Sequence, residues 1–94
     1  MIAMKASEIA SVVQGTLHGA DVTVTEAAVI NSSEATPGSL FLAIKGERVD
    51  GHDYVSDAQS HGAVLTLSTK EVAGPHIVVS DVVVALGKLA QHVR

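Results

Sequence analysis

Two short and almost wholly apolar runs, residues 40–44 and 63–67, constrain the fold of this chain more than any other feature. A strand with one face in water alternates apolar and polar residues, whereas a continuous apolar run is typical of a strand covered on both faces, as in a parallel sheet. A helix-sized segment that Asp53 can cap and Gly62 can end lies between the runs. Strand, helix and strand in this order predict a βαβ unit.

Shorter patterns extend the predicted unit at both ends. Residues 76–79 have the composition of a third strand, and Asp81 is placed to cap a final helix. Near the start of the chain, Ser7 can cap a short helix that Gly15 would end. Both helices repeat apolar residues at helical spacing, so each is predicted to have one apolar face.

The segment that follows the first helix is predicted to be a β-hairpin. Residues 16–18 form a strand-sized piece, and residues 22–25 alternate apolar and polar side chains. Residues 27–30 can extend the second strand. The expected fold class is therefore α/β: a small, mostly parallel sheet with βαβ crossover helices plus an N-terminal β-hairpin layer, in a single domain that spans residues 1–94.

Composition and charge exclude several function classes. Apolar residues make up 47% of the chain, aromatic residues only 2%, and cysteine is absent, so the core is aliphatic and no disulfide can form. The formal net charge of -4 argues against nucleic-acid and anionic membrane partners. Neither a secretory signal nor an apolar stretch near the ~20 residues of a membrane span is visible, and we predict a cytoplasmic protein.

Motifs of self-contained catalysis are missing from the sequence. It contains no G-x-x-x-x-G-K-[ST] phosphate loop, G-x-G-x-x-G, G-x-S-x-G or H-E-x-x-H. Its five histidines are scattered without ligand-like spacing, whereas a zinc site needs three or four convergent ligands. We predict no metal site and no catalytic residue, and an independent small enzyme has no nucleophile and base pair to support it.

The loop after the first apolar run is the richest in candidate binding residues. Lys45, Arg48 and His52 give it three potentially cationic side chains, whereas Lys5 is the only lysine or arginine before it. Ligands of open α/β sheets bind at the carboxyl ends of strands, where this loop begins. The pattern fits an anion site and equally an ordinary solvated connection.

A second polar cluster follows the predicted hairpin. Asn31, Ser32 and Ser33 carry small hydrogen-bonding side chains that can pair with a nucleobase, a ribose or a phosphate. Taken alone, such residues are more typical of a turn.

A longer pattern resembles a known family. Residues 37–55, PGSLFLAIKGERVDGHDYV, are similar to the P-G-D-L-F-[VL]-A-[LI]-K-G-E-R-x-D-G-H-[DN]-[FY] segment of the Mur ligases. The letters KGER and DGH resemble the ligases that add D-alanyl-D-alanine to UDP-N-acetylmuramoyl-tripeptide more than those that add the third residue of the peptide. The resemblance covers nearly the whole chain, with further matches at residues 7–10, 15–17, 62–63 and 77–79.

The resemblance implies a role in binding. The matching part of these ligases is an N-terminal domain that holds the uridine diphosphate end of UDP-N-acetylmuramoyl-peptide. Their central domain binds ATP with Mg, and the C-terminal domain handles the incoming dipeptide. By this resemblance the chain needs no cofactor itself, and its partners are the substrate and the central and C-terminal domains of a longer protein.

Carried over by position, the uracil contacts of related ligases fall on two segments. They are Ile30, Ser32, Glu47, Arg48 and Val49. Their neighbours complete the candidate substrate-binding set: Asn31, Ser33, Lys45, Gly46, Asp50, Gly51 and His52.

The sequence departs from the family at three of these positions, and two of the changes remove a charge. Where the family usually has T-D-S-R, residues 30–33 are I-N-S-S, so Asn31 replaces an acidic residue and Ser33 an arginine. The missing arginine is a bidentate phosphate donor, so Arg48 or Lys45 would have to supply the charge. Two alternatives stay open: an interaction or regulatory module with a decayed nucleotide site, and the equivalent domain of the ligases that add the third residue.

Overall fold

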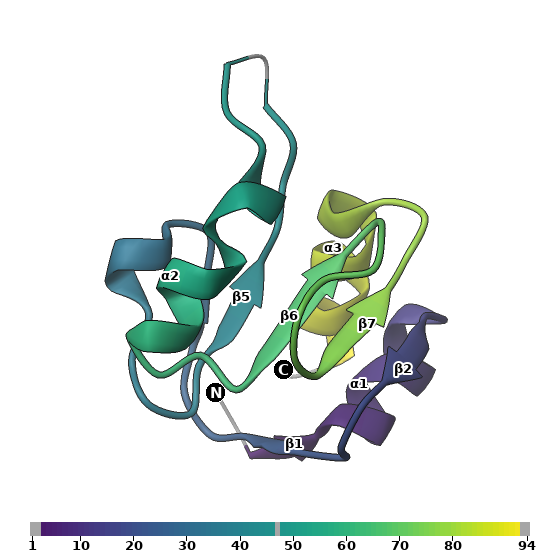
Figure 1. Cartoon of the computed structure of the whole chain (residues 1–94). Helices are drawn as coiled ribbons and strands as arrows, with labels where there is room; N and C mark the ends of the chain where they lie inside the picture. The colour runs from purple at the N-terminus through teal and green to yellow at the C-terminus, as the bar shows by residue number, and fades with distance from the viewer. Residues whose placement is uncertain (1–2, 47, 93–94) are drawn as a thin grey trace.

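The structure, a computed structural model, describes residues 3–46 and 48–92 (Figure 1). Its strands are β1 (Met4–Lys5), β2 (Thr16–His18), β3 (Thr23–Val24), β4 (Ala28–Val29), β5 (Leu40–Leu42), β6 (Leu65–Ser68) and β7 (His76–Val78). Its helices are α1 (Ala6–Val13), α2 (Val55–Ser60) and α3 (Val82–His92), with the 3-10 turns η1 (Ser32–Glu34) and η2 (Gly51–Tyr54). In these ranges no helix is both long and apolar enough to cross a membrane.

Five strands form the main sheet in the order β2-β7-β6-β5-β4. The four strands from β4 to β7 are parallel, and β2 is antiparallel to β7. In register, Leu40 of β5 pairs with Leu65 of β6, and Leu67 of β6 pairs with Ile77 of β7. The predicted α/β class with a mostly parallel sheet is confirmed, and the carboxyl ends of four strands lie together at one end of the sheet.

Both faces of β5 are covered, which explains its continuous apolar run. Leu40 and Leu42 belong to a core shared with α1 and α3, whereas Phe41 between them belongs to a second core against α2 (Figure 1). All three side chains are buried. Burial of one such side chain contributes about 1.5–3 kcal/mol to folding, so this single strand stabilises two layers.

The N-terminal strands pair differently from the prediction. The hairpin expected between residues 16–18 and 22–25 does not form: β2 joins the main sheet, and β3 pairs with β1 in a separate antiparallel sheet. Leu17 packs against the main core, while the Val22 carbonyl accepts a hydrogen bond from the Ala6 N–H (2.7 Å). Strands this short have little pairing preference of their own, so these long-range contacts select the partner.

The first helix starts and ends on residues other than those predicted. Ser7 is not its cap, because the Ser7 N–H (2.8 Å) and hydroxyl (2.9 Å) both donate to the carboxylate of Asp21. These bonds lower the pKa of Asp21. At the other end Gln14, not Gly15, is left-handed, with φ 58°. Gly15 is required for space, since a Cβ there would lie 2.5 Å from the side chain of Ile77.

The later helix signals are mostly as predicted. Asp81 accepts a hydrogen bond from the Val83 N–H (2.9 Å) and so caps α3. Gly62, with φ 113°, follows the end of α2. Asp53 does not cap a helix; it lies inside η2, whose N-cap is Asp50. Asp50 accepts a hydrogen bond from the His52 N–H (3.0 Å) and so caps η2. A 3-10 turn that was not predicted therefore precedes α2.

Candidate functional site

A pocket of about 500 Å³ lies beside the carboxyl ends of β4 and β5. The turn after β4, the loop after β5 and the two ends of η2 form most of its wall. A volume in this range is typical of small-molecule sites. The lining residues are Ile30, Asn31, Ser32, Phe41, Ile44, Gly46, Val49, Gly51 and Tyr54.

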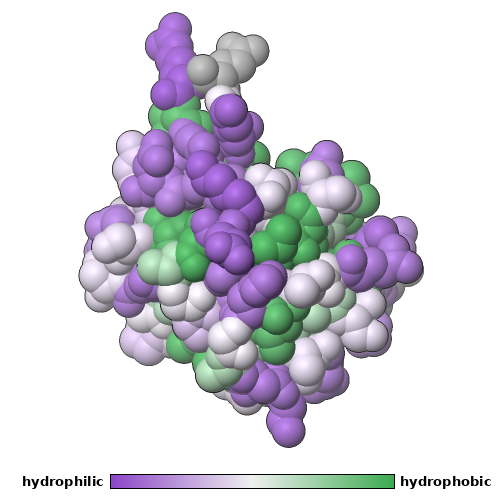
Figure 2. Space-filling model, turned by 45° about the vertical axis from the view of Figure 1, so that its right-hand side comes forward, coloured by the Kyte–Doolittle hydropathy of each residue, from purple (hydrophilic) through white to green (hydrophobic). Residues whose placement is uncertain are grey.

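Exposed apolar side chains gather around this pocket. Of the five large hydrophobic side chains that the described residues expose, three line it: Ile30 (57% exposed), Val49 (52%) and Tyr54 (44%). Fully buried Phe41 lines it as well. Figure 2 shows hydrophobic surface near the base of the projecting polar loop. Apolar side chains that converge on a concavity indicate a surface that a ligand covers.

The turn after β4 contributes the polar groups of the pocket. The Ser32 hydroxyl donates to Oδ2 of Asp57 (2.7 Å), which ties the turn to α2. Asn31 Oδ1 accepts hydrogen bonds from the N–H (3.1 Å) and the hydroxyl (2.9 Å) of Ser33. Because these bonds use the Ser32 proton and the Asn31 amide oxygen, Ser32 Oγ is left to accept and the Asn31 amide nitrogen to donate. The wall thus offers one acceptor and one donor side by side.

The loop after β5 forms another wall and projects from the body of the molecule (Figures 1 and 2). The Gly46 N–H donates to the Val49 carbonyl (2.7 Å), and at the base the Gly51 N–H donates to the Ile44 carbonyl (2.9 Å). A Cβ on Gly51 would lie 2.7 Å from the Ile44 backbone nitrogen, so only glycine allows this close approach. Glu47, a predicted contact in the same loop, lies outside the described residues.

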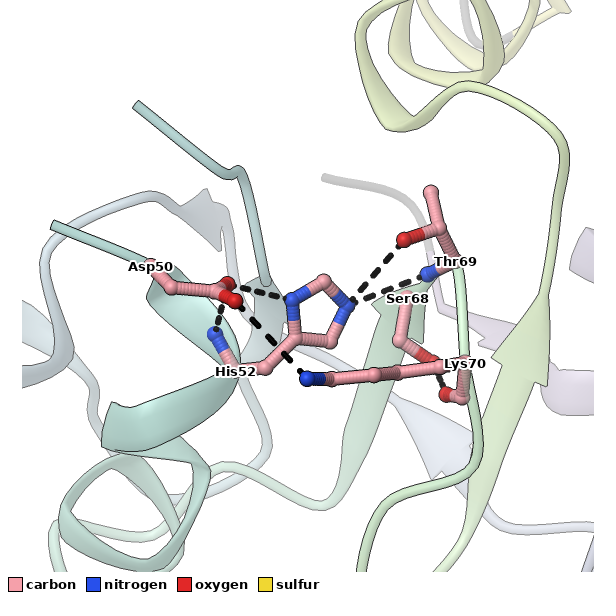
Figure 3. Close-up of polar contacts among 5 residues, drawn as sticks. All are labelled: Asp50, His52, Ser68, Thr69 and Lys70. Carbon is pink, nitrogen blue, oxygen red and sulfur yellow. Dashed lines mark hydrogen bonds and ion pairs between the residues drawn. The ribbon is translucent and has the colours of Figure 1, made fainter. Parts of the chain in front are cut away.

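Asp50 and His52 anchor this loop to the β6–β7 connection (Figure 3). Asp50 Oδ1 accepts hydrogen bonds from the backbone N–H (3.0 Å) and the imidazole Nδ1 (2.5 Å) of His52. The other ring nitrogen, Nε2, accepts from the Thr69 N–H (3.2 Å). Lys70 Nζ lies 3.7 Å from Asp50 Oδ2. The hydrogen bonds from His52, aided by the Lys70 charge, lower the pKa of Asp50.

A smaller hollow of about 260 Å³ lies beside the first, and Ile44 borders both. Lys45, Thr69, Ser80 and Asp81 supply its polar groups. It follows the carboxyl ends of β5, β6 and β7. An anion here would meet one lysine and two hydroxyl groups, together with one carboxylate.

The structure brings the two predicted segments together. Six of the candidate residues line the larger pocket: Ile30, Asn31, Ser32, Gly46, Val49 and Gly51. One, Lys45, borders the smaller hollow. The other candidates with a described position, which line neither, are Ser33, Arg48, Asp50 and His52.

The sequence interpretation missed three apolar lining residues. Phe41 and Ile44 belong to the run predicted as buried strand, and Tyr54 to a predicted helix face. Nothing local distinguishes a side chain that packs in the core from one that also borders a cavity. Tyr54 offered one signal, since it is one of only two aromatic residues and lies two positions after the candidate loop.

Comparison with known proteins decides the family. The family model described as "Mur ligase family, catalytic domain" matches residues 25–94. This chain belongs to the Mur ligase family. It corresponds to the N-terminal domain of the ligases that add D-alanyl-D-alanine, so the resemblance found in the sequence is confirmed.

Two curated relatives show the extent of the match. The UDP-N-acetylmuramoyl-tripeptide--D-alanyl-D-alanine ligase of Escherichia coli (strain K12) is 38% identical over 96 residues, which cover 100% of this chain and 21% of that protein. The UDP-N-acetylmuramoyl-L-alanyl-D-glutamate--2,6-diaminopimelate ligase of Aquifex aeolicus (strain VF5) is 43% identical over 63 residues, 65% of this chain and 13% of that protein. The chain thus spans about a fifth of the length of the first relative.

Solved structures agree with this Mur ligase assignment. MurF from Acinetobacter baumannii matches with a TM-score of 0.83 at 26% identity, over 95% of this chain and 20% of that chain. MurF ligase from Thermotoga maritima, solved in complex with ADP, matches with a TM-score of 0.68 at 34% identity, over 73% of this chain and 17% of that chain. The α/β fold of this domain is therefore that of MurF enzymes.

Proposed function

We propose that this chain is the substrate-recognition domain of a ligase that adds D-alanyl-D-alanine to a peptidoglycan precursor. Its larger pocket would hold the uridine end of UDP-N-acetylmuramoyl-peptide. The observation that carries the proposal is the meeting of residues 30–32 with Ile44, Gly46, Val49 and Gly51 around exposed hydrophobic side chains. A planar base has two apolar faces that Ile30, Val49 and Tyr54 can cover.

The polar pair on the turn after β4 fits the edge of uracil. Uracil presents an N–H donor between two carbonyl acceptors, so Ser32 Oγ can accept from the ring N–H while the Asn31 amide nitrogen donates to a carbonyl oxygen. Cytosine has a lone pair where uracil has that N–H, so two acceptors would face each other. An unpaired buried polar group costs about 1–3 kcal/mol, which favours uridine over cytidine.

The diphosphate needs a cation near the pocket. Ser33, at the position of the family's arginine, donates its hydroxyl to Asn31 and carries no charge. Lys45 borders the adjacent hollow together with Thr69 and Ser80. We therefore assign the diphosphate to Lys45, because it borders the hollow beside the larger pocket, whereas Arg48 lines neither concavity.

The remaining chemistry belongs to the longer protein that the relatives represent. ATP and Mg would be used by its central domain, and the chain itself has no phosphate loop motif for them. Within the described ranges there is no group of three histidine, cysteine or acidic side chains that could hold a metal ion. We assign this chain binding and no catalytic step, and its cytoplasmic location stays a prediction.

Titration of the isotope-labelled chain with UMP, CMP and UDP-N-acetylmuramoyl-tripeptide, followed by NMR, tests the proposal. We expect shifts at residues 30–32 and 49–51, and weaker binding of CMP. Val49→Asp should lower the UMP affinity about tenfold or more, because it puts a charge into an apolar wall. Val84→Asp, at an equally exposed valine on α3, is the matched control and should leave it unchanged. No shifts with either uridine ligand at millimolar concentration would reject the proposal.

A second candidate function is an interaction module whose nucleotide site has decayed. It is favoured by the hydrogen bonds between Asn31 and Ser33, which occupy two of the positions where the chain departs from the family. The double variant Asn31→Asp with Ser33→Arg distinguishes the candidates. A decayed site predicts that the variant gains uridine nucleotide binding that the native chain lacks, whereas binding by the native chain rejects this function.

A further inference from the structure

His52 lies between two connections at the carboxyl end of the sheet. Its side chain is only 4% exposed. It links Asp50, in the loop that walls the pocket, to Thr69, in the β6–β7 connection (Figure 3). His52 does not line the larger pocket. Its contacts instead fix the position of one loop relative to the other.

The partners of the imidazole define its tautomer. A backbone N–H can only donate, so the Nε2 atom that accepts from the Thr69 N–H carries a lone pair. The proton of the neutral ring is then on Nδ1, where it is donated to Asp50 Oδ1. The ring is therefore a link with a donor at one end and an acceptor at the other.

The far end of the link is itself ordered. Ser68, fully buried at the end of β6, donates its hydroxyl to the Lys70 carbonyl (2.8 Å) and so fixes the turn that carries Thr69. Lys70 also approaches Asp50, but its side chain is 60% exposed, and ion pairs in water contribute little. The imidazole is thus the better shielded of the two polar links that join these connections in the described structure.

We infer that His52 is a positioning residue for the pocket, and that its Nδ1-protonated ring sets the angle of the projecting loop. Val49, one of the pocket residues on that loop, directly precedes Asp50, so any movement of Asp50 moves Val49. The inference rests on the proposed function, because it names what keeps the nucleotide pocket in shape.

Two substitutions separate the two ends of the link. His52→Gln can place an amide oxygen near the Nε2 position and accept from Thr69, whereas His52→Asn keeps a donor near Nδ1 and does not reach Thr69. We expect both variants to weaken UMP binding, His52→Gln by about threefold because it loses the bond to Asp50, and His52→Asn by about tenfold because it loses the contact with the other connection. His61→Asn, at an exposed histidine that follows α2, is the matched control and should bind UMP as the native chain does.

Two readouts without ligand report the same link. Imidazole nitrogen shifts should show the Nδ1-protonated ring in the native chain, and hydrogen exchange at the Thr69 amide should be slow in the native chain and in His52→Gln but fast in His52→Asn. Equal affinity and equal exchange in the two variants would overturn the inference. If the native chain binds no UMP, the proposed function fails, and the exchange rates together with the backbone order of residues 48–50 decide the inference alone.

Discussion

Asp21 and Asp50 use the same chemistry in two regions with different consequences. Each carboxylate accepts hydrogen bonds from the backbone N–H and the side chain of a residue near the start of a helical segment, Ser7 in α1 and His52 in η2. Asp21 joins α1 to the segment that leads into β3, whereas Asp50 belongs to the loop that walls the pocket. The consequence of such a contact therefore depends on the neighbours of the segment it fixes.

Steric substitutions should separate the two regions most strongly. In Gly15→Ala the new Cβ would lie 2.5 Å from Ile77 Cγ2, so we expect a loss of about 1–3 kcal/mol in unfolding free energy with unchanged UMP affinity. In Gly51→Ala it would lie 2.7 Å from the Ile44 nitrogen, so the pocket wall must shift and UMP affinity should fall about tenfold or more. Urea unfolding and NMR titration measure the two effects.

Gly87→Ala is the control for both glycine variants. Nothing lies within 4 Å of a Cβ at this position in α3, so alanine should raise the unfolding free energy by about 0.5–1 kcal/mol through helix propensity. If Gly15→Ala and Gly51→Ala changed stability and affinity in the same proportion, the two regions would be one unit and the comparison would fail.

Removal of the charge on Asp21 or on Asp50 should have a smaller effect than the glycine substitutions. The Asp21 variant should lose stability alone, and the Asp50 variant should lose UMP affinity as well. Asp21→Asn weakens the bonds to Ser7, so the unfolding free energy should fall while UMP affinity stays unchanged. Asp50→Asn weakens the bonds to His52, so affinity should fall as well. Thermal unfolding and the same titration check both variants, and a loss of affinity in Asp21→Asn would contradict the separation.

The two carboxyl groups also predict a pH dependence of stability. Both pKa values lie below the ordinary value of 3.8 in the folded chain, so the unfolded chain binds protons more readily. Their stabilisation is complete above that value and is lost as the pH falls through the lower folded pKa. As the pH is lowered from about 5 to about 2, the unfolding free energy should decrease. The decrease should be less steep in Asp21→Asn than in the native chain. The same slope in that variant would contradict the assignment.

The smallest effect is expected at Lys70. Its exposed ammonium lies 3.7 Å from Asp50 Oδ2, so Lys70→Ala should change the unfolding free energy by about 0–1 kcal/mol and leave UMP affinity within about twofold. An affinity loss as large as that of His52→Asn would make the ion pair, and not the imidazole, the main link between the loops.

The predictable parts of the fold are those with local causes. The run at residues 40–44 predicts a strand covered on both faces, and Asp81 caps the helix that directly follows it. The partner of β2 was not predictable, because Leu17 gains burial in the main core only once the distant β7 is in place. Ser7 was misjudged for the same reason, since the carboxylate that bonds it lies fourteen residues away.

The candidate site was predictable in its segments but not in its walls. The resemblance to the Mur ligases carried residues 30–33 and 45–52 to one site. The structure brings six of them to one pocket: Ile30, Asn31, Ser32, Gly46, Val49 and Gly51. Tyr54 and Ile44 were missed because exposure to a cavity is a property of the assembled loops. The link from His52 to Thr69 was likewise invisible, since it joins residues that are seventeen positions apart.

The most direct test of the account is the set of intermolecular NOEs between uridine diphosphate and the labelled chain. We predict contacts from the uracil H5 and H6 protons to the methyl groups of Ile30 and Val49 and to the Tyr54 ring. Contacts confined to the other exposed hydrophobic side chains, Val83 and Val84 of α3, would contradict it.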